Sequence, residues 1–399
     1  MKRHLLKTLI LAATIIPSVV MAADASTKMP APTVSDILDA SGITVSGYLD
    51  VAYNKMNSTG LFFNAVPGPV SSGLTGNSRI FDTPGARADQ NFSSFNLHQA
   101  ALIVSKMPKE GAGGYLNLTA GQDAATIAST GFGASSPDNS SHMFDVTQAY
   151  ASYTTGSLTI IGGKFATLAG AELITTPSNK NYSRAWMFGW GPYTHTGTRA
   201  TYVASDKITL IAGLNNGWDQ VISTTPTKTT ELGFILAPVS MFSLATSYYH
   251  GKEMGTAVVG TRRYLDMVGT ITVSDKLNFV FDYANGRQDA ALTGGGKAKW
   301  NALALYANYQ FNDTWRASYR HEAFDDKDGF RSNLTDVGGT LLGQKLTSNT
   351  ATVGYAVAKN MELRGEVRLD KSDMDAFLQN DGTAKKNQTS YAVQAVYQF

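Results

Sequence analysis

The stretch MELRGEVRLD at residues 361–370 alternates without exception between two kinds of side chain. Its odd-numbered positions carry apolar residues or glycine. Its even-numbered positions are all charged: Glu362, Arg364, Glu366, Arg368 and Asp370. Because successive side chains of a β-strand point to opposite faces of the sheet, this run predicts a strand with one apolar and one charged face.

The same alternation recurs elsewhere at similar length. In residues 314–324, Trp315, Ala317 and Tyr319 share one face. The opposite face is polar or charged: Arg316, Ser318, Arg320 and Glu322. Strands of soluble proteins usually have about five or six residues, whereas a tilted strand needs about 9–11 to cross a bilayer. Length and alternation together favour strands that cross a membrane with their apolar faces toward lipid.

Short polar turns join many of these runs in pairs. VASDKITLIAGLNNG (203–217) and TVSDKLNFVFDYANG (272–286) both place Ser-Asp-Lys between two alternating runs, a pattern typical of a β-hairpin. Five further links of this kind are KMPKEGAGG (106–114), TTGS (154–157), APVSM (237–241), FNDTW (311–315) and AKNM (358–361). Long loops rich in Gly, Ser, Thr, Asn and Asp separate the hairpins.

Sixteen runs qualify as strands. They are 42–54, 93–106, 113–122, 143–154, 157–166, 195–204, 207–216, 229–238, 241–250, 261–273, 276–286, 298–311, 314–324, 346–358, 361–370 and 388–399. The predicted fold is all-β, a transmembrane antiparallel β-barrel of about 16 strands with short periplasmic turns and long extracellular loops. A barrel of this size encloses an aqueous channel.

The chain begins with a predicted signal peptide, residues 1–22. Lys2, Arg3 and Lys7 precede an apolar stretch, and a small-residue cleavage site ends at Ala22. Removal of those three cations reduces the 33 Lys and Arg to 30, against 31 Asp and Glu. A periplasmic segment with a short helix is predicted at 23–41, followed by the barrel at 42–399.

Several function classes find no support in the composition. The chain has no cysteine, which excludes disulfides, thiolate metal sites and cysteine nucleophiles. No His pair has metal-ligand spacing, and no Ser/His or Asp/His set stands out. The nearly neutral mature chain lacks a basic tract for nucleic acid. We therefore expect neither an enzyme nor a cofactor or metal.

The last run, QTSYAVQAVYQF, ends in Phe399 with Tyr397 in phase two positions earlier. Such an ending resembles the insertion signal of bacterial outer-membrane proteins, which the barrel-insertion machinery reads. The alternative is a final amphipathic strand without that role.

Two stretches resemble a known family. GGKFATLAGAELI (162–174) and NYSRAWMFGWGPYTHTGTRATY (181–202) are similar to the OmpL-like β-barrel porin-2 family of outer-membrane porins, and SDILDASGITVSGYLDVAYN (35–54) fits the same pattern. The resemblance covers about 35–399. It implies a channel for small hydrophilic solutes in a bacterial outer membrane, and general porins form homo-trimers.

General porins fold their third long loop into the lumen, and the resemblance implies the same for residues 167–194. This stretch is rich in aromatic and charged residues, and the candidates for the constriction are Glu172, Lys180, Arg184, Trp186 and Trp190. The aromatic rings would pack on the inner wall while the charged groups face water. The alternative is that the aromatics cap the barrel or belong to its interfacial girdle.

The charged faces of 314–324 and 361–370 are candidates for the pore lining. Residues 346–358 between them carry only small side chains on the matching face, so long side chains from both neighbours can meet there, roughly 10 Å apart at the backbone. Lys164 and Arg199 are also expected inside, because a lysine in the lipid would cost ~2–4 kcal/mol. The wall either tunes ion passage or forms a neutral lattice that only stiffens it.

The leading hypothesis is an outer-membrane porin that lets ions and small hydrophilic solutes diffuse passively. One alternative is an occluded barrel whose surface loops serve in adhesion or attachment. Another is a soluble secreted β-protein.

Overall fold

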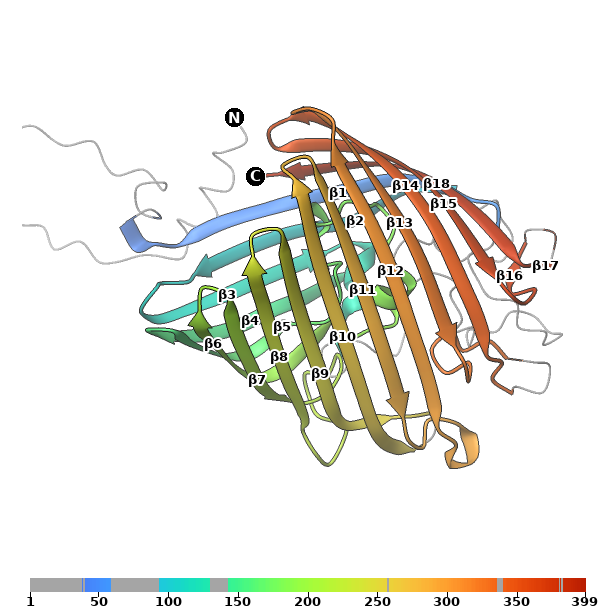
Figure 1. The fold of residues 1–399 in the computed structure, drawn as a ribbon, viewed down its shortest axis with the longest axis horizontal. Coiled ribbons are helices and arrows are strands. Elements are labelled where there is room, and N and C mark those ends of the chain that lie inside the picture. The colour runs from blue at the N-terminus through green and yellow to red at the C-terminus, as the bar shows by residue number, and fades with distance from the viewer. Residues whose placement is uncertain are drawn as a thin grey trace, which may run out of the picture.

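The computed structural model describes residue 38 and residues 40–58, 93–129, 143–256, 258–335, 340–379, 381 and 383–399. Within that part of the chain, sixteen strands form one closed antiparallel barrel (Figure 1). Each strand pairs with its neighbours in sequence, and β1 pairs with β18 to close the ring.

The wall strands are β1 (Thr44–Met56), β2 (Ser93–Lys106), β3 (Gly111–Ala120), β4 (Phe144–Thr155), β5 (Leu158–Ala166), β6 (Thr194–Ser205), β7 (Ile208–Asn215), β8 (Thr229–Val239), β9 (Phe242–Met254), β10 (Val259–Ser274), β11 (Leu277–Gln288), β12 (Ala298–Gln310), β13 (Trp315–Asp326), β14 (Gln344–Ala358), β15 (Met361–Ser372) and β18 (Asn387–Gln398). Other elements are α3 (Gln122–Ile127), η1 (Thr176–Ser178), α4 (Trp186–Gly189), η2 (Thr293–Gly295) and the hairpin of β16 (Phe377–Leu378) and β17 (Ala384–Lys385).

All sixteen predicted runs coincide with wall strands, so the predicted fold is confirmed. The predicted signal peptide lies outside the described residues. Of the predicted N-terminal helix, only residues 38, 40 and 41 are described near its end, and they are helical. No helix among the described residues is long and apolar enough to cross a membrane.

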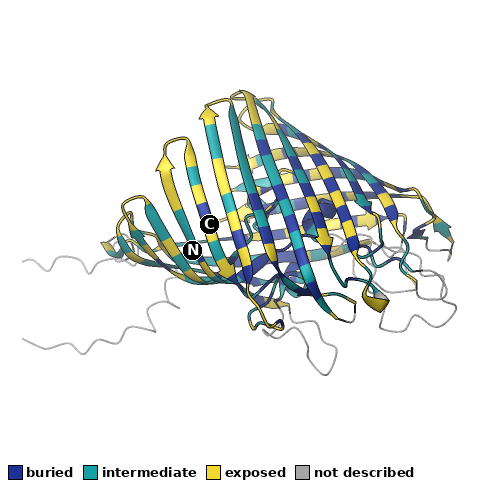
Figure 2. Cartoon of the chain, turned by 60° about the horizontal axis from the view of Figure 1, so that its bottom comes forward, coloured by how far each residue is buried: buried dark blue, intermediate teal, exposed yellow. Residues whose placement is uncertain are grey.

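The two faces of the wall differ as the alternation predicts, and Figure 2 shows exposed and buried positions alternating along the strands. On β12, Leu303 and Leu305 are exposed on the outside, whereas Ala302, Ala304 and Tyr306 are buried on the inside. Burial on the inside places polar side chains where they need hydrogen-bond partners, since an unpaired buried polar group costs free energy.

The repeated Ser-Asp-Lys sequence forms the same turn twice. Ser205 Oγ accepts a hydrogen bond from the Lys207 amide at 3.2 Å, and Ser274 Oγ accepts one from the Lys276 amide at 3.3 Å. Each turn joins two consecutive strands, β6 to β7 and β10 to β11. The local side-chain acceptor favours a tight link, as the residue types predict.

The C-terminus contributes to the closure of the barrel. The backbone groups of Phe399 and Gly47 exchange two hydrogen bonds of 2.9 Å. A Cβ on Gly47 would lie 2.4 Å from the carbonyl oxygen of Ala101 and 2.5 Å from the ring of Phe399. Gly47 therefore lets three chain segments approach closely at the seam.

We predict that Gly47→Val lowers the yield of folded barrel, because the added side chain must displace both the Phe399 ring and the β2 backbone, at a cost of ~1–3 kcal/mol. Heat-modifiable mobility on gels measures the folded fraction. Gly365→Val is the matched control, since Gly365 also faces outward and a Cβ there meets nothing within 4 Å. Equal folded fractions for the two variants would contradict this role of Gly47.

Candidate functional site

The third loop, residues 167–194, links β5 to β6 and contains η1 and α4. Its Trp186 and Trp190 are buried. Trp190 packs edge-on against Phe324, with 4.7 Å between ring centroids, and the Arg368 guanidinium lies 5.1 Å from the Trp186 ring centroid. Phe324 and Arg368 belong to the inward-facing sides of β13 and β15. These two tryptophans therefore contact the inner wall.

Two glutamates of the wall each bind consecutive amides of the loop. The Glu322 carboxylate on β13 accepts hydrogen bonds from the amides of Trp186 and Met187, both at 2.9 Å. The Glu366 carboxylate on β15 accepts them from Tyr182 at 2.7 Å and Ser183 at 3.0 Å. Charge-assisted bonds of this kind are stronger than those between neutral groups.

A second pair of carboxylates holds the start of the loop. Asp266 on β10 accepts a hydrogen bond from the Gly170 amide at 2.8 Å, and Asp282 on β11 accepts one from the Ala171 amide at 2.7 Å. The hydroxyl oxygen of Tyr249 on β9 accepts a hydrogen bond from the Leu168 amide at 2.9 Å. Three adjacent strands thus bind a short run of loop backbone.

Arginines of the wall bind the loop carbonyls. Arg320 donates to the Ser183 carbonyl at 2.6 Å and to the Glu172 carboxylate at 2.5 Å. Arg316 donates to the carbonyl of Lys180 at 2.8 Å. Arg368 donates to the carbonyl of residue 184 at 2.6 Å. Wall arginines thus donate to loop carbonyls, while wall carboxylates accept hydrogen bonds from loop amides.

The first two strands of the barrel also contact the loop. Asn54 on β1 donates to the Tyr182 hydroxyl at 2.9 Å, and His98 on β2 lies 3.0 Å from the same oxygen. Gln99 donates to the carbonyl of Ile174 at 2.9 Å. Hydrogen bonds thus join this loop to β1 and β2 on one side and to β10, β11, β13 and β15 around the ring.

Charged side chains within the loop cross-link it. One carboxylate oxygen of Glu172 binds Arg320, and the other accepts a hydrogen bond of 2.7 Å from the Ala185 amide. Arg184 donates to the carbonyl of Ile174 at 3.3 Å and to the Thr176 hydroxyl at 3.2 Å. Both side chains are buried.

Lys180 differs from the other loop candidates because it is exposed. Its backbone carbonyl binds Arg316. Partial desolvation, together with repulsion from Arg316, lowers the pKa of the Lys180 ammonium. Lys180 therefore places a water-accessible amine beside the charged wall.

The charged wall forms ion pairs across a glycine. Arg316 Nε on β13 lies 2.5 Å from Glu362 Oε1 on β15, and Arg364 Nε lies 2.6 Å from Glu362 Oε2. A Cβ on Gly354, in the intervening strand β14, would lie 2.5 Å from Glu362 Oε1. Gly354 is therefore required for the bridge. The Glu362 side chain remains 24% exposed, while Arg368 and Asp370 form a buried pair at 2.7 Å.

Lys164 and Arg199 both lie on the buried side of the wall, and each contacts a carboxylate. Lys164 Nζ lies 3.1 Å from Asp145 on β4, and Arg199 Nη2 lies 2.7 Å from Glu231 on β8. Gly213 again lies between the latter partners, since β7 separates their strands. Our sequence reasoning missed both carboxylates. A glycine opposite a charged residue in the neighbouring strand is the signal that could have indicated Glu231.

A second feature missed from the sequence is a cavity of about 470 Å³ between the third loop and the long-loop ends of β9 and β10. Trp218 forms part of its lining, with the guanidinium carbons of Arg262 and Arg331 lying 4.4 Å and 5.6 Å from its ring. Glu253 accepts the Trp218 amide at 3.0 Å. Cation–π stacking holds this aromatic group between two positive charges.

No group of three or more His, Asp or Glu side chains suited to a metal ion occurs among the described residues. The arrangement is that of a closed barrel whose inner wall is polar and whose third loop is bound to it. It defines an outer-membrane channel protein of the porin class.

The chain belongs to the family described as "Putative beta-barrel porin-2, OmpL-like", whose model matches residues 42–399. Members of this family are porins, which are typically channels without enzymatic activity. No curated protein matches the chain.

Solved structures with the same fold include three porins or channels. The anion-selective porin from Comamonas acidovorans has a TM-score of 0.61 at 12% identity, covering 90% of this chain and 99% of its own. The channel DcaP of Acinetobacter baumannii has a TM-score of 0.60 at 13% identity, and the alignment covers 90% of this chain and 97% of DcaP. Pseudomonas putida OprB scores 0.57 at 11% identity, with 91% and 96% covered. At these identities the comparison shows the fold.

The loop between β7 and β8 supports the end of the third loop through a buried carboxylate. Asp219 accepts the amides of Tyr193 at 3.0 Å and Thr194 at 2.8 Å. Burial raises the pKa of Asp219 to about 6, although the two amides oppose the shift. The folded protein therefore binds this proton more tightly than the unfolded chain, whose Asp titrates near about 3.9.

The sign of this shift gives a test. The stabilisation from proton binding at Asp219 is complete below about pH 4 and is lost as the pH rises through about 6. Asp219→Asn keeps the acceptor oxygen without the charge, so we predict equal stabilities at the acid limit and a gain of at most about 3 kcal/mol at neutral pH. Urea unfolding in detergent measures the stabilities of the two proteins at each pH. A difference between the two proteins that does not change with pH would contradict the assignment.

Proposed function

We propose that this protein is a water-filled channel for passive diffusion of ions and small hydrophilic solutes, narrowed by its third loop. The observation that carries the proposal is the set of hydrogen bonds between the loop backbone and inward-facing side chains. Glu322, Glu366, Asp266 and Asp282 bind its amides, and Asn54 on β1 binds the Tyr182 side chain. We assign no catalytic role to any residue.

Two kinds of charged residue have different roles in this proposal. Buried groups such as Arg320 and Arg368 hold the loop, because their hydrogen bonds go to its carbonyls. Groups with access to water set the preference for ions, and these are Lys180 and Glu362. Arg316 is buried and acts on this preference through its ion pair with Glu362. The two interpretations of the mixed-charge wall, stiffening and selection, thus apply to different residues of the same wall.

The C-terminal strand carries the proposed insertion signal. Tyr397 and Phe399 are both exposed on the outer face, with 6.2 Å between their ring centroids. A paired aromatic edge on the last strand suits recognition by the insertion machinery. Some porins with this fold are trimeric, since one structure of Vibrio cholerae OmpT is of the trimer form, and a homo-trimer is our proposal for this chain.

Planar bilayers test the channel and the loop together. We predict discrete conductance steps for the refolded protein and larger, noisier steps for Glu322→Gln combined with Glu366→Gln. Each glutamine places a donor against a loop amide, so each site loses a charge-assisted bond worth ~1–3 kcal/mol and the wall holds this part of the loop less tightly. Glu110→Gln, in an exposed turn, is the control.

Two outcomes would count against parts of this proposal. Unchanged steps in the double glutamine variant would contradict a loop that limits the current. A folded, inserted protein that gives no steps at all would instead favour an occluded barrel whose outer loops act in attachment.

Ion preference is tested by the reversal potential across a salt gradient. An ion passing about 8 Å from one charge in water senses ~0.5 kcal/mol, so Arg316→Gln should shift relative permeability toward cations by roughly twofold. Adding Arg320→Gln should change conductance as well, since Arg320 holds the loop. Arg287→Gln, whose charge lies on the outer face, is the matched control. If Arg316→Gln leaves the reversal potential unchanged, Arg316 does not select ions.

A further inference from the structure

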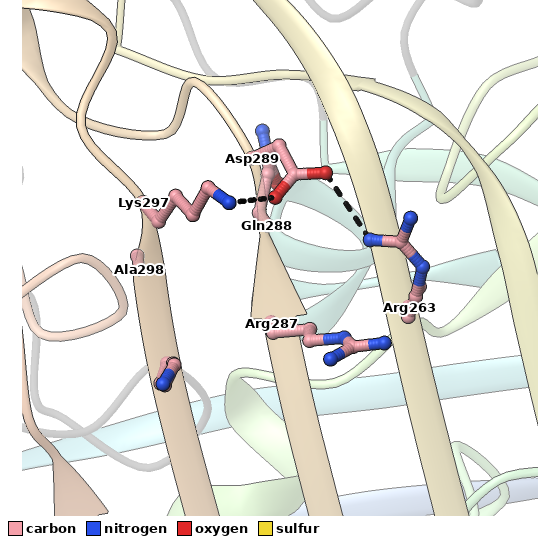
Figure 3. A pocket seen from close by; sticks show the side chains of 7 residues that line it. Arg263, Arg287, Gln288, Asp289, Lys297 and Ala298 are labelled. Carbon is pink, nitrogen blue, oxygen red and sulfur yellow. Dashed lines mark hydrogen bonds and ion pairs between the residues drawn. The ribbon is translucent and has the colours of Figure 1, made fainter.

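A basic cluster lies on the outer face of the barrel, where the strands meet the long loops. Arg263 on β10 is directly opposite Arg287 on β11, and Arg287 is directly opposite Lys299 on β12. Lys297, in the loop before β12, completes the cluster. Together with Asp289 these side chains line a hollow of about 320 Å³. Figure 3 shows the Arg263 side chain directed at Asp289 and the Arg287 side chain extending from the neighbouring strand toward the strand of Arg263.

The carboxylates nearby only partly balance these charges. Asp289 lies 3.2 Å from Arg263 and 3.7 Å from Lys297, and the hydrogen bond from Arg263 lowers its pKa. Asp328 accepts the backbone amide of Lys299 at 2.8 Å. His250 lies opposite Arg263 on β9 and adds no negative charge. Four cations therefore face two carboxylates.

Directly opposed like charges in a sheet are destabilising, and here three strands in a row carry them. Neither Arg287 nor Lys299 has an ion pair with a side chain among the described residues. An external anion between the side chains would offset this repulsion, and guanidinium groups bind phosphate through parallel hydrogen bonds. The hollow is many times the ~30 Å³ that one water molecule occupies.

The height of the cluster on the wall indicates where such an anion would come from. On β11, Arg287 follows the outward-facing Phe279, Phe281 and Tyr283 on the same face. Arg287 lies four positions after Tyr283, which is about 13 Å along the strand and about 9 Å along the membrane normal for strands tilted by ~45°. The headgroup layer of a bilayer occupies roughly the first 5–8 Å beyond the hydrocarbon core. With Tyr283 at the edge of the hydrocarbon core, the backbone of Arg287 lies just beyond this layer, and its long side chain reaches back to the headgroups, above an apolar surface that suits acyl chains.

We propose that this cluster, formed by Arg263, Arg287, Lys297 and Lys299, binds the phosphate groups of an anionic lipid of the outer leaflet. The acyl chains of that lipid lie along the exposed face of β11 and β12. The site is outside the barrel, so it is independent of the channel proposed above.

The test uses the full mature barrel in phosphatidylcholine nanodiscs that contain diphosphoryl lipid A. Native mass spectrometry after transfer to detergent counts the lipid A molecules retained. Arg287→Gln with Lys299→Gln removes two of the four cations of the cluster, so we expect retention to fall by at least about tenfold. Arg316→Gln, which removes a charge inside the barrel, should retain lipid A like the wild type.

Two further arms distinguish the source of the phosphate. Lipid A without phosphates should be retained no better by the wild type than by the double variant. Inorganic phosphate alone should not displace diphosphoryl lipid A, because it lacks the acyl chains. Equal retention of diphosphoryl lipid A by the wild type and the double variant would overturn the proposal. Displacement by inorganic phosphate would overturn it in favour of a site for free phosphate.

Discussion

A loop backbone inside a barrel must find hydrogen-bond partners other than water, and this constraint governs the inner wall. Each buried amide or carbonyl without a partner costs free energy. Here carboxylates bind amides and guanidinium groups bind carbonyls, as Glu322 and Arg320 do from one strand. The alternating charges of β13 and β15 match the alternating polarity of a peptide chain. The wall is mixed in charge because the backbone it binds is dipolar.

This use of charge leaves few side chains for any solute. Arg320 and Arg368 are fully buried, whereas Glu362 and Lys180 keep contact with water. A wall with equal numbers of positive and negative residues can therefore still present an uneven field, because burial removes some of them from the lumen. Counting charges along a strand therefore does not give the field in the lumen, because the exposure of each group also contributes.

The period of two was sufficient to predict the strands, their faces and their number. It placed Arg316 and Glu362 on the same side of the wall, and the small residues of β14 indicated that their side chains could meet. It could not predict which loop atoms they bind, because the third loop has no repeat. Arg262 and Arg263 illustrate the limit. The alternation places Arg262 on the face of Asp266 and Arg263 on that of Leu265. It does not show that Arg262 stacks on Trp218, which lies in a loop.

That adjacent pair also shows how one strand serves two environments. Arg262 stacks on Trp218 inside the barrel, while Arg263 binds Asp289 on the outside. Both charges lie near the long-loop end, where the apolar band of the outer face has ended. A charge on the outer face is tolerated there because headgroups and water replace hydrocarbon, whereas the same charge a few residues further along β10 would lie beside Leu265 and Met267 in lipid. The position of the outward cations therefore indicates the depth of the barrel in the membrane, and it does so independently of the lumen.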